Sequence, residues 1–415
     1  MFEIEEPKER LILVAVSARD DDDTQESLDE LEELVNTAGG ITVGRVVQNR
    51  ERIHPRSYIG KGKIDEVIEL INENDATGIV CDDELTPAQM RNLSKDLDIK
   101  VMDRTILILD IFANRATTKE GKIQVELAQL RYRLTHLVGM RESLSRLGGG
   151  IGTRGPGEMK LEIDRRHIRN RISVLKQELD QVKQTRDTLR ESRKKSNIPV
   201  AAIVGYTNAG KSTLLNTLTD AGVLEEDKLF ATLDPTTRNL LLPSGQQLLL
   251  TDTVGFIRKL PHNLVESFQS TLEEAKYADI ILHVVDSSNP DVYKQMHIVY
   301  ETLKSLGIKD KPIITLFNKD DLRDKDTILK DIKADHTLKI SAKHSTGLDK
   351  LLEVLEDVLR ENKVYIEKVF DFNEAAKIQT IRKYGELLLE EYQAEGIFVK
   401  AYLPKDLYDK IKHEL

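Results

Sequence analysis

The stretch that decides the fold is Gly205-Tyr206-Thr207-Asn208-Ala209-Gly210-Lys211-Ser212. It follows the apolar run 198–204 and precedes a helix-forming segment at 213–218. This pattern is typical of a phosphate-binding loop, in which backbone N–H groups surround the α- and β-phosphates of a nucleotide at a helix N-terminus. We expect Lys211 to reach the β- and γ-phosphates and the Ser212 hydroxyl to ligate Mg²⁺. A chance match to this pattern would lack the expected strand before the loop and the expected helix after it.

A second motif, Asp252-Thr253-Val254-Gly255, ends the apolar run 248–250. Its spacing from the loop suits a carboxylate that holds the Mg²⁺ shell and a glycine N–H that meets the γ-phosphate. We therefore assign the first role to Asp252 and the second, catalytic role to Gly255.

Two further motifs follow strands and indicate which base is bound. Asn318-Lys319-Asp320-Asp321 ends the apolar run 313–317, and Ser341-Ala342-Lys343 closes a later one. A carboxylate two residues after the lysine matches the amino and imino donors of guanine, and adenine offers no such pair. Asp321 thus favours GTP over ATP, and the Ser341–Lys343 turn would place a backbone N–H at the guanine oxygen. Four motifs in this order resemble the translation-factor-like class of P-loop GTPases and predict an α/β domain over residues 197–362.

Length and composition are those of a protein with several globular domains. The chain has 415 residues, 40% of them hydrophobic and 32% charged, which fits two to four domains. It contains no run of 18 apolar residues, and its first ten residues are acidic rather than leader-like, so we expect a cytosolic protein without a membrane span. The single cysteine, Cys81, lies in a short apolar strand candidate and is interpreted as a buried structural thiol. We expect a monomer.

Charge is unevenly distributed along the chain. The net charge is −10, yet residues 131–195 carry 17 Lys and Arg against 8 Asp and Glu, whereas residues 1–115 carry 14 against 26. A basic stripe in an acidic protein indicates binding to a polyanion such as RNA. A solvated helical surface would give the same pattern.

Residues 1–115 alternate strand and helix patterns, which predicts an N-terminal parallel α/β domain. Expected strands are 11–16, 41–47, 78–82 and 99–102, and expected helices are 25–36, 64–72 and 87–97. A glycine-lysine turn, Tyr58 to Lys63, opens one helix within a basic neighbourhood. It lacks the spacing of a phosphate-binding loop, so contact with an RNA backbone and simple turn chemistry both remain open.

Residues 116–196 predict a helical hairpin with a glycine-rich tip. Leucine and isoleucine recur at steps of three and four over 123–144 and again over 161–189, as expected for two amphipathic helices that pack together. The loop between them, Gly148 to Gly157, has six glycines in ten residues and is flanked by arginines. A disordered connector is one interpretation. We favour the other, a tip that contacts RNA, because glycines allow close approach while arginines hold phosphates and stack on bases.

Several long motifs resemble the HflX family of ribosome-associated GTPases. They are Gln124 to Leu130, Leu144 to Glu158, Asp164-Arg165-Arg166, Gly205 to Ser212, and Phe230 to Arg238, within a resemblance that runs from about residue 10 to about 360. The resemblance implies binding to the large ribosomal subunit and its rRNA near the peptidyl-transferase region, through the N-terminal domain and the hairpin. It also implies a part in splitting or rescuing ribosomes under stress.

The same resemblance suggests the switch I segment, Phe230-Ala231-Thr232-Leu233-Asp234. We choose Thr232 as the Mg²⁺ and γ-phosphate ligand because it lies 21 residues after Lys211 and 20 before Asp252. Thr236 and Thr237 are the alternatives. After Gly255 the chain has Phe256, which cannot orient a water molecule as a glutamine would, so hydrolysis should be slow without an activating partner.

A ribosomal group or a monovalent cation could remedy that slowness. Asn208 occupies the loop position at which similar GTPases ligate K⁺, although bracing of the loop by a backbone hydrogen bond is an equal alternative.

The last residues, 363–415, read strand, helix, two strands and helix, which predicts a small C-terminal α+β domain. Two functions compete with splitting or rescue of ribosomes: a role in ribosome assembly, and RNA remodelling in which GTP only sets the affinity.

Overall fold

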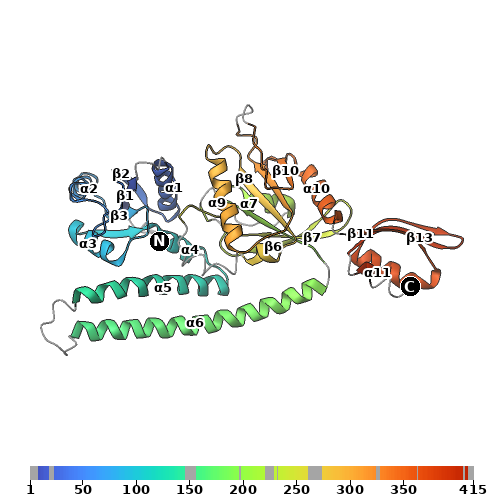
Figure 1. Ribbon diagram of the computed structural model, residues 1–415, viewed down its shortest axis with the longest axis horizontal. Coiled ribbons are helices and arrows are strands. Elements are labelled where there is room, and N and C mark those ends of the chain that lie inside the picture. Colours follow the sequence, from blue (N-terminus) through green and yellow to red (C-terminus); the bar gives the residue numbers. More distant parts are fainter. Residues whose placement is uncertain are drawn as a thin grey trace, which may run out of the picture. The chain divides into compact units, whose positions relative to one another are not determined.

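A computed structural model gives the fold (Figure 1). It describes residues 8–17, 23–144, 156–195, 198–219, 229–230, 232–259, 273–323, 328–361, 363–404 and 407–409. Within those ranges, every helix is too short or too polar to span a lipid bilayer.

The chain divides into two compact units. The first combines Met1–Val182 with Glu226–Asp234 and Ile257–Gln269, and the second combines Lys183–Glu225 with Pro235–Phe256 and Ser270–Leu415. By this division, the described residues 229–230, 232–234 and 257–259 belong to the first unit. This assignment bears directly on the site described below.

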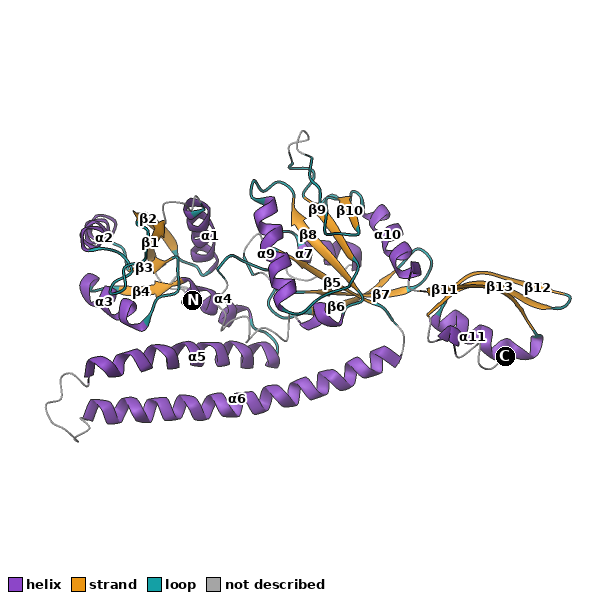
Figure 2. Ribbon diagram, in the orientation of Figure 1, coloured by secondary structure: helices purple, strands orange, loops and turns teal. Residues whose placement is uncertain are grey.

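The first unit is built on a four-stranded parallel sheet. Its strands are β1 (Arg10–Ser17), β2 (Ile41–Asn49), β3 (Gly78–Cys81) and β4 (Lys100–Asp103), in the spatial order β2-β1-β3-β4. Helices α2 (Lys61–Asn74) and α3 (Pro87–Leu97) cover one face, and α1 (Thr24–Thr37) and α4 (Arg104–Arg115) cover the other (Figure 2). Burial of both faces explains why the strands are nearly continuous apolar runs. Cys81 lies in this core as a fully buried free thiol, as the sequence predicted.

Two long helices, the second only as far as Val182, complete the unit as an antiparallel hairpin (Figure 1). They are α5 (Lys119–Leu144) and α6 (Pro156–Lys195). Their predicted apolar stripes meet in a cluster formed by Ile123, Leu127, Leu175 and Leu179. One expectation was wrong: Pro156 and Gly157 belong to the first turn of α6 and not to the loop, as suits a proline at the first helical position. The remainder of the predicted tip, residues 148–155, lies outside the described residues.

The second unit contains a six-stranded sheet in the order β10-β9-β8-β5-β7-β6, in which only β6 runs antiparallel. The strands are β5 (Val200–Gly205), β6 (Thr236–Leu241), β7 (Gln247–Asp252), β8 (Ile280–Asp286), β9 (Ile313–Asn318) and β10 (His336–Lys339). Helices α7 (Lys211–Thr219), α9 (Val292–Ser305) and α10 (Leu348–Glu361) pack on it. The parallel strands all end at one edge, where the four sequence motifs begin.

A small antiparallel sheet in the order β11-β13-β12 ends the described chain. It consists of β11 (Lys363–Phe370), β12 (Glu386–Gln393) and β13 (Gly396–Pro404), and the short turn η1 (Phe372–Glu374) and the helix α11 (Ala375–Tyr384) lie between β11 and β12 in the chain. Helix α11 covers one face of this sheet around Val399 and Ile381 (Figure 2). These elements agree with the predicted α+β appendage; of the last predicted helix, only 407–409 are described, and they are helical.

Candidate nucleotide site

The phosphate-binding loop joins β5 to α7 and has the backbone shape that its sequence predicts. Asn208 and Gly210 both adopt positive φ angles, of 59° and 90°, which turn the chain sharply before the helix. Helix α7 begins at Lys211, so its first N–H groups face the loop. The loop and the helix N-terminus together form the backbone arrangement that binds phosphate.

Lys211, Ser212 and Asp252 lie together at the start of α7 and the end of β7. The Ser212 hydroxyl donates to Asp252 Oδ2 at 2.8 Å, and Lys211 Nζ donates to the Tyr206 carbonyl at 2.7 Å. Burial lowers the pKa of Lys211 to about 8, against the opposing effect of Asp252. A hydroxyl beside a carboxylate supplies the hard oxygen ligands that Mg²⁺ prefers, so this pair fits the predicted metal role.

One asparagine ties the loop to both base-recognition motifs. Asn318 Nδ2 donates to the Ala209 carbonyl at 2.9 Å, and the Ala342 N–H donates to Asn318 Oδ1 at 2.9 Å. Thr217 of α7 also donates to the Ala342 carbonyl at 3.0 Å. The structure therefore brings together Gly205–Ser212, Asn318 and Ser341–Lys343, although they are far apart in the sequence.

The other residues of the Asn318–Asp321 motif are held in place by local ion pairs. Lys319 has a φ of 60° and pairs with Asp286 at 2.8 Å, and Asp320 accepts from Arg323 at 2.7 Å. A hydrogen bond from the Ser341 side chain lowers the pKa of Asp321, which favours its ionised carboxylate. Asp321 also lies 3.6 Å from His344.

The segment after Asp252 runs directly along the phosphate-binding loop. Thr253 donates to the Ile203 carbonyl at 2.7 Å, and Val254 is buried. The Phe256 N–H donates to the Gly205 carbonyl at 3.1 Å, and the Thr207 N–H donates to the Phe256 carbonyl at 2.8 Å. Phe256 itself is 2% exposed, so its side chain belongs to the core.

The switch I residues make their described contacts in the first unit. Phe230 packs edge-on against Phe112 of α4, with 4.7 Å between ring centroids, and Leu233 is buried. The Asp234 carboxylate accepts hydrogen bonds from the N–H groups and hydroxyls of Thr117 and Thr118, which immediately precede α5. Ala231 lies outside the described residues. The alternatives Thr236 and Thr237 lie on β6, where Thr237 Oγ1 is 3.0 Å from Thr251 Oγ1.

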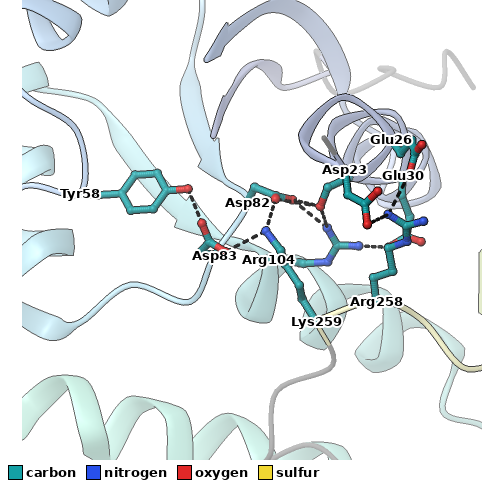
Figure 3. A network of polar contacts seen from close by, with 10 residues as sticks. Asp23, Glu26, Glu30, Tyr58, Asp82, Asp83, Arg104, Arg258 and Lys259 are labelled. Atoms are coloured by element: carbon teal, nitrogen blue, oxygen red, sulfur yellow. Dashed lines mark hydrogen bonds and ion pairs between the residues drawn. The ribbon is translucent and has the colours of Figure 1, made fainter. Parts of the chain in front are cut away.

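Sequence reasoning missed a buried ionic network at the carboxyl end of β3 (Figure 3). Asp82 accepts from Ser27 at 2.8 Å, from Arg104 at 2.8 Å and from Lys259 at 2.5 Å. Asp83 accepts from Tyr58 at 2.7 Å and from Lys259 at 2.8 Å. The only signal in the sequence was an acidic pair after an apolar strand, which is also common in plain turns. We call Asp82 and Asp83 the β3 carboxylate pair.

Arg258 and Arg104 extend this network to helix α1. Arg258 pairs with Glu26 at 3.2 Å and with Asp23 at 3.8 Å, while Arg104 pairs with Glu30. Burial would lower the pKa of Lys259, but Asp82 and Asp83 outweigh it and raise that pKa. In the sequence, Arg258 and Lys259 follow the Asp252–Gly255 motif after two intervening residues, Phe256 and Ile257.

The strand order, the phosphate-binding loop and the two base-recognition motifs define a P-loop GTPase. Family models agree: one described as GTP-binding GTPase N-terminal matches residues 25–113, one described as GTP-binding GTPase middle region matches 115–193, and one described as 50S ribosome-binding GTPase matches 200–319. The chain belongs to the HflX family of GTPases.

Relatives match over nearly the whole chain. GTPase HflX of Lacrimispora saccharolytica is 67% identical over 408 residues, which cover 98% of this chain and 96% of that relative. GTPase HflX of Caldanaerobacter subterraneus subsp. tengcongensis is 48% identical over 413 residues, covering 100% of this chain and 95% of that relative. A crystal structure of SsGBP in complex with GDP is 26% identical, covers 84% of this chain and 98% of its own, and has a TM-score of 0.48.

Proposed function

We propose that this GTPase binds the large ribosomal subunit in its GTP state, through the N-terminal domain and the helical hairpin, and splits or rescues ribosomes under stress. The observation that carries the proposal is the family match over residues 200–319, whose description names the 50S ribosome. Full-length similarity to HflX relatives and the basic composition of α6 support it.

The chemistry of hydrolysis follows from the loop and its neighbours. Bound Mg²⁺ would be held by Ser212 and, in the GTP state, by Thr232, with Asp252 ordering its shell; the metal would neutralise charge on the β- and γ-phosphates. Lys211 would pair with the same phosphates, and Gly255 would offer its N–H to the γ-phosphate. Asp321 and the Ser341–Lys343 turn would select guanine. Because Phe256 is apolar and buried, no side chain at that position orients the attacking water.

Contact with RNA would come from the hairpin. Arg166 and Arg169 on α6 are both exposed, and they follow the glycine-rich tip in the sequence. Exposed arginines on a helix bind phosphate by releasing counterions, so each contact makes affinity more sensitive to salt. These two side chains provide a direct test of the proposed surface.

The test is co-sedimentation of the purified chain with small subunits, large subunits and whole ribosomes, each with GDP or a non-hydrolysable GTP analogue. We expect binding to large subunits only with the analogue, and loss of whole ribosomes on incubation with GTP. Arg166→Gln with Arg169→Gln should weaken binding and lower the slope of log affinity against log salt by roughly 2. The control is Lys304→Gln on α9, whose side chain is 73% exposed and lies far from the hairpin in sequence.

Each contrary result has a distinct meaning. Equal binding with GDP and the analogue would refute the nucleotide-dependent interaction. Preference for immature particles over finished subunits would indicate a role in ribosome assembly. Splitting that proceeds at full rate without hydrolysis, with GTP only setting affinity, would indicate an RNA-binding remodeller.

We also propose that K⁺ assists hydrolysis through the Asn208 side-chain carbonyl. The support is the position of Asn208 at the sharp turn of the loop, where its φ of 59° is sterically costly for a residue with a side chain. Turnover at matched ionic strength should be several-fold faster in KCl than in NaCl, and Asn208→Ala should remove the difference. Equal turnover in the two salts would leave Asn208 with a bracing role only.

A further inference from the structure

Asp286, the last residue of β8, lies between the two parts of the nucleotide site. In the sheet order β10-β9-β8-β5, strand β8 stands between β9, which ends at Asn318, and β5, which leads into the phosphate-binding loop. Asp286 and Asn318 are register partners on the two parallel strands. The Asp286 carboxylate is therefore at the same sheet edge as the base-recognition motif and the loop, in the interval between them.

Lys319 extends from the base-recognition motif to this carboxylate. Its Nζ lies 2.8 Å from Asp286 Oδ2, and the two side chains are only 26% and 16% exposed. The ion pair thus lays the methylene stem of the lysine from the end of β9 across to the end of β8. A nucleotide with its base at Asp321 and its phosphates at the loop after β5 must cross the same interval. The stem gives that interval an apolar surface.

Two serines after β8 hold both ends of this ion pair. Ser288 donates to Asp286 Oδ1 from its N–H at 3.0 Å and from its hydroxyl at 2.6 Å. Ser287 donates to the Asn318 carbonyl from its N–H at 2.9 Å and from its hydroxyl at 2.7 Å. Lys319 has a φ of 60°, a left-handed conformation that surrounding interactions must maintain. One carboxylate oxygen of Asp286 thus faces Ser288 and the other faces Lys319.

We propose that Asp286 is a positioning residue for nucleotide binding, which holds Lys319 extended so that its methylene stem covers one face of the bound base. The proposal rests on the proposed recognition of guanine by Asp321. A lysine side chain has several rotatable bonds and loses that freedom when it packs on a ligand. The ion pair with Asp286 orders Lys319 in advance, so binding of the nucleotide does not carry this cost.

The test measures equilibrium affinities of the purified chain for GDP by isothermal titration calorimetry. Asp286→Asn keeps an amide oxygen for Ser288 but places its NH₂ group towards Lys319, so the ion pair is lost. Affinity for GDP should fall about threefold to tenfold, the range for a long side chain that has to be ordered on binding. The control is Asp291→Asn, which removes the carboxylate of another lysine pair, with Lys294 at 3.2 Å, and should leave the affinity unchanged.

A double-mutant cycle shows whether Asp286 acts through Lys319. Lys319→Met keeps an apolar stem but loses the ammonium group, so adding Asp286→Asn to it should cause no further loss of GDP affinity. Losses that add in the double variant would overturn the proposal, as would an unchanged affinity in Asp286→Asn alone. If Asp286→Asn does not fold, Ser288→Ala replaces it: this variant removes one hydrogen bond to Asp286 Oδ1 and should give a smaller loss that also disappears in Lys319→Met.

The preference for GDP over inosine diphosphate separates positioning of the stem from loosening of the whole Asn318–Asp321 motif. Inosine lacks the amino group of guanine, and a surface that covers the face of the ring does not read this group. Asp286→Asn should therefore weaken both ligands by the same factor. A lower preference for GDP in that variant would show that the motif has loosened and would overturn the proposal. An unchanged preference in Asp321→Asn would instead refute the proposed recognition of guanine.

Discussion

Gly210 shows how a single residue decides the shape of the loop. Its φ of 90° is one that side chains rarely tolerate, and a Cβ atom there would lie closer than 3.0 Å to Asn318 Nδ2. Asn318 is the residue that joins the loop to the Ser341–Lys343 turn through its two hydrogen bonds. The absence of a side chain at Gly210 is therefore a requirement of the base-recognition motif as well as of the backbone.

Replacement of Gly210 by alanine tests this requirement against a matched control. Gly245 has a φ of 80° and no atom within 4 Å of an added Cβ. Gly245→Ala should therefore lower the free energy of unfolding by about 1–2 kcal/mol, only because alanine is strained at a positive φ. Gly210→Ala should cost a further 1–2 kcal/mol of unfolding free energy because it disrupts the hydrogen bonds of Asn318. It should also lower GDP affinity at least tenfold, about 1.4 kcal/mol. Urea unfolding and calorimetry measure both; equal GDP binding by the two variants would contradict the argument.

Among the elements, α5 is capped by a residue from a distant segment of the chain. Asp234 lies more than a hundred residues from Thr117 and Thr118, yet its carboxylate receives all four of their donors at 2.5–2.9 Å. A carboxylate at a helix N-terminus satisfies free N–H groups and complements the helix dipole. Burial alone would raise the pKa of Asp234, but the bonds from Thr118 and Thr117 outweigh it and lower that pKa. The cap thus couples the switch I segment to the hairpin.

Loss of this cap should destabilise the first unit. Asp234→Ala should lower the free energy of unfolding by about 1–2 kcal/mol at pH 7. Since the pKa of Asp234 is lower in the folded state, its contribution is present above the unfolded value of about 3.9 and is lost as the pH falls through the folded value. The difference from wild type should therefore shrink below about pH 4.

Asp291→Ala is the control, because Asp291 stands at the N-cap of α9 without a capping hydrogen bond from its side chain. Urea unfolding of both variants and the wild type over this pH range gives the comparison. Equal losses of stability in the two variants would show that Asp234 has no special role at α5.

At the scale of the whole molecule, sequence patterns predicted what is encoded locally. The alternation of strands and helices in residues 1–115 depends on short periodicities, and the structure confirms it; the four GTPase motifs each follow a strand of the second sheet. Helix α4 was missed because its core residues, such as Leu107, Ile108 and Ile111, sit in a stretch so apolar that no helical stripe stands out. Strand β6 was missed because an edge strand with polar residues resembles a loop.

Contacts between distant segments had no signal that sequence reasoning could use. Lys259 and Asp82 are 177 positions apart, and neither lies in a recognisable motif. The same holds for Asp234, which the family pattern suggested as a nucleotide contact but which the structure engages in capping α5. Long-range electrostatic pairing depends on how the units fold, and a one-dimensional pattern does not specify it.

The single cysteine makes opening of the first unit measurable through the rate at which a thiol reagent labels it. Cys81 is the only cysteine in the 415 residues, is completely buried on β3 beside the carboxylate pair, and has a pKa that burial raises well above normal. A thiol reagent can reach it only when the sheet opens, so the labelling rate of the unmodified protein reports the frequency of that opening. Comparing the labelling rate with each nucleotide, or with a ribosomal subunit, would show in which state the N-terminal sheet opens least often. The natural cysteine makes an engineered reporter group unnecessary.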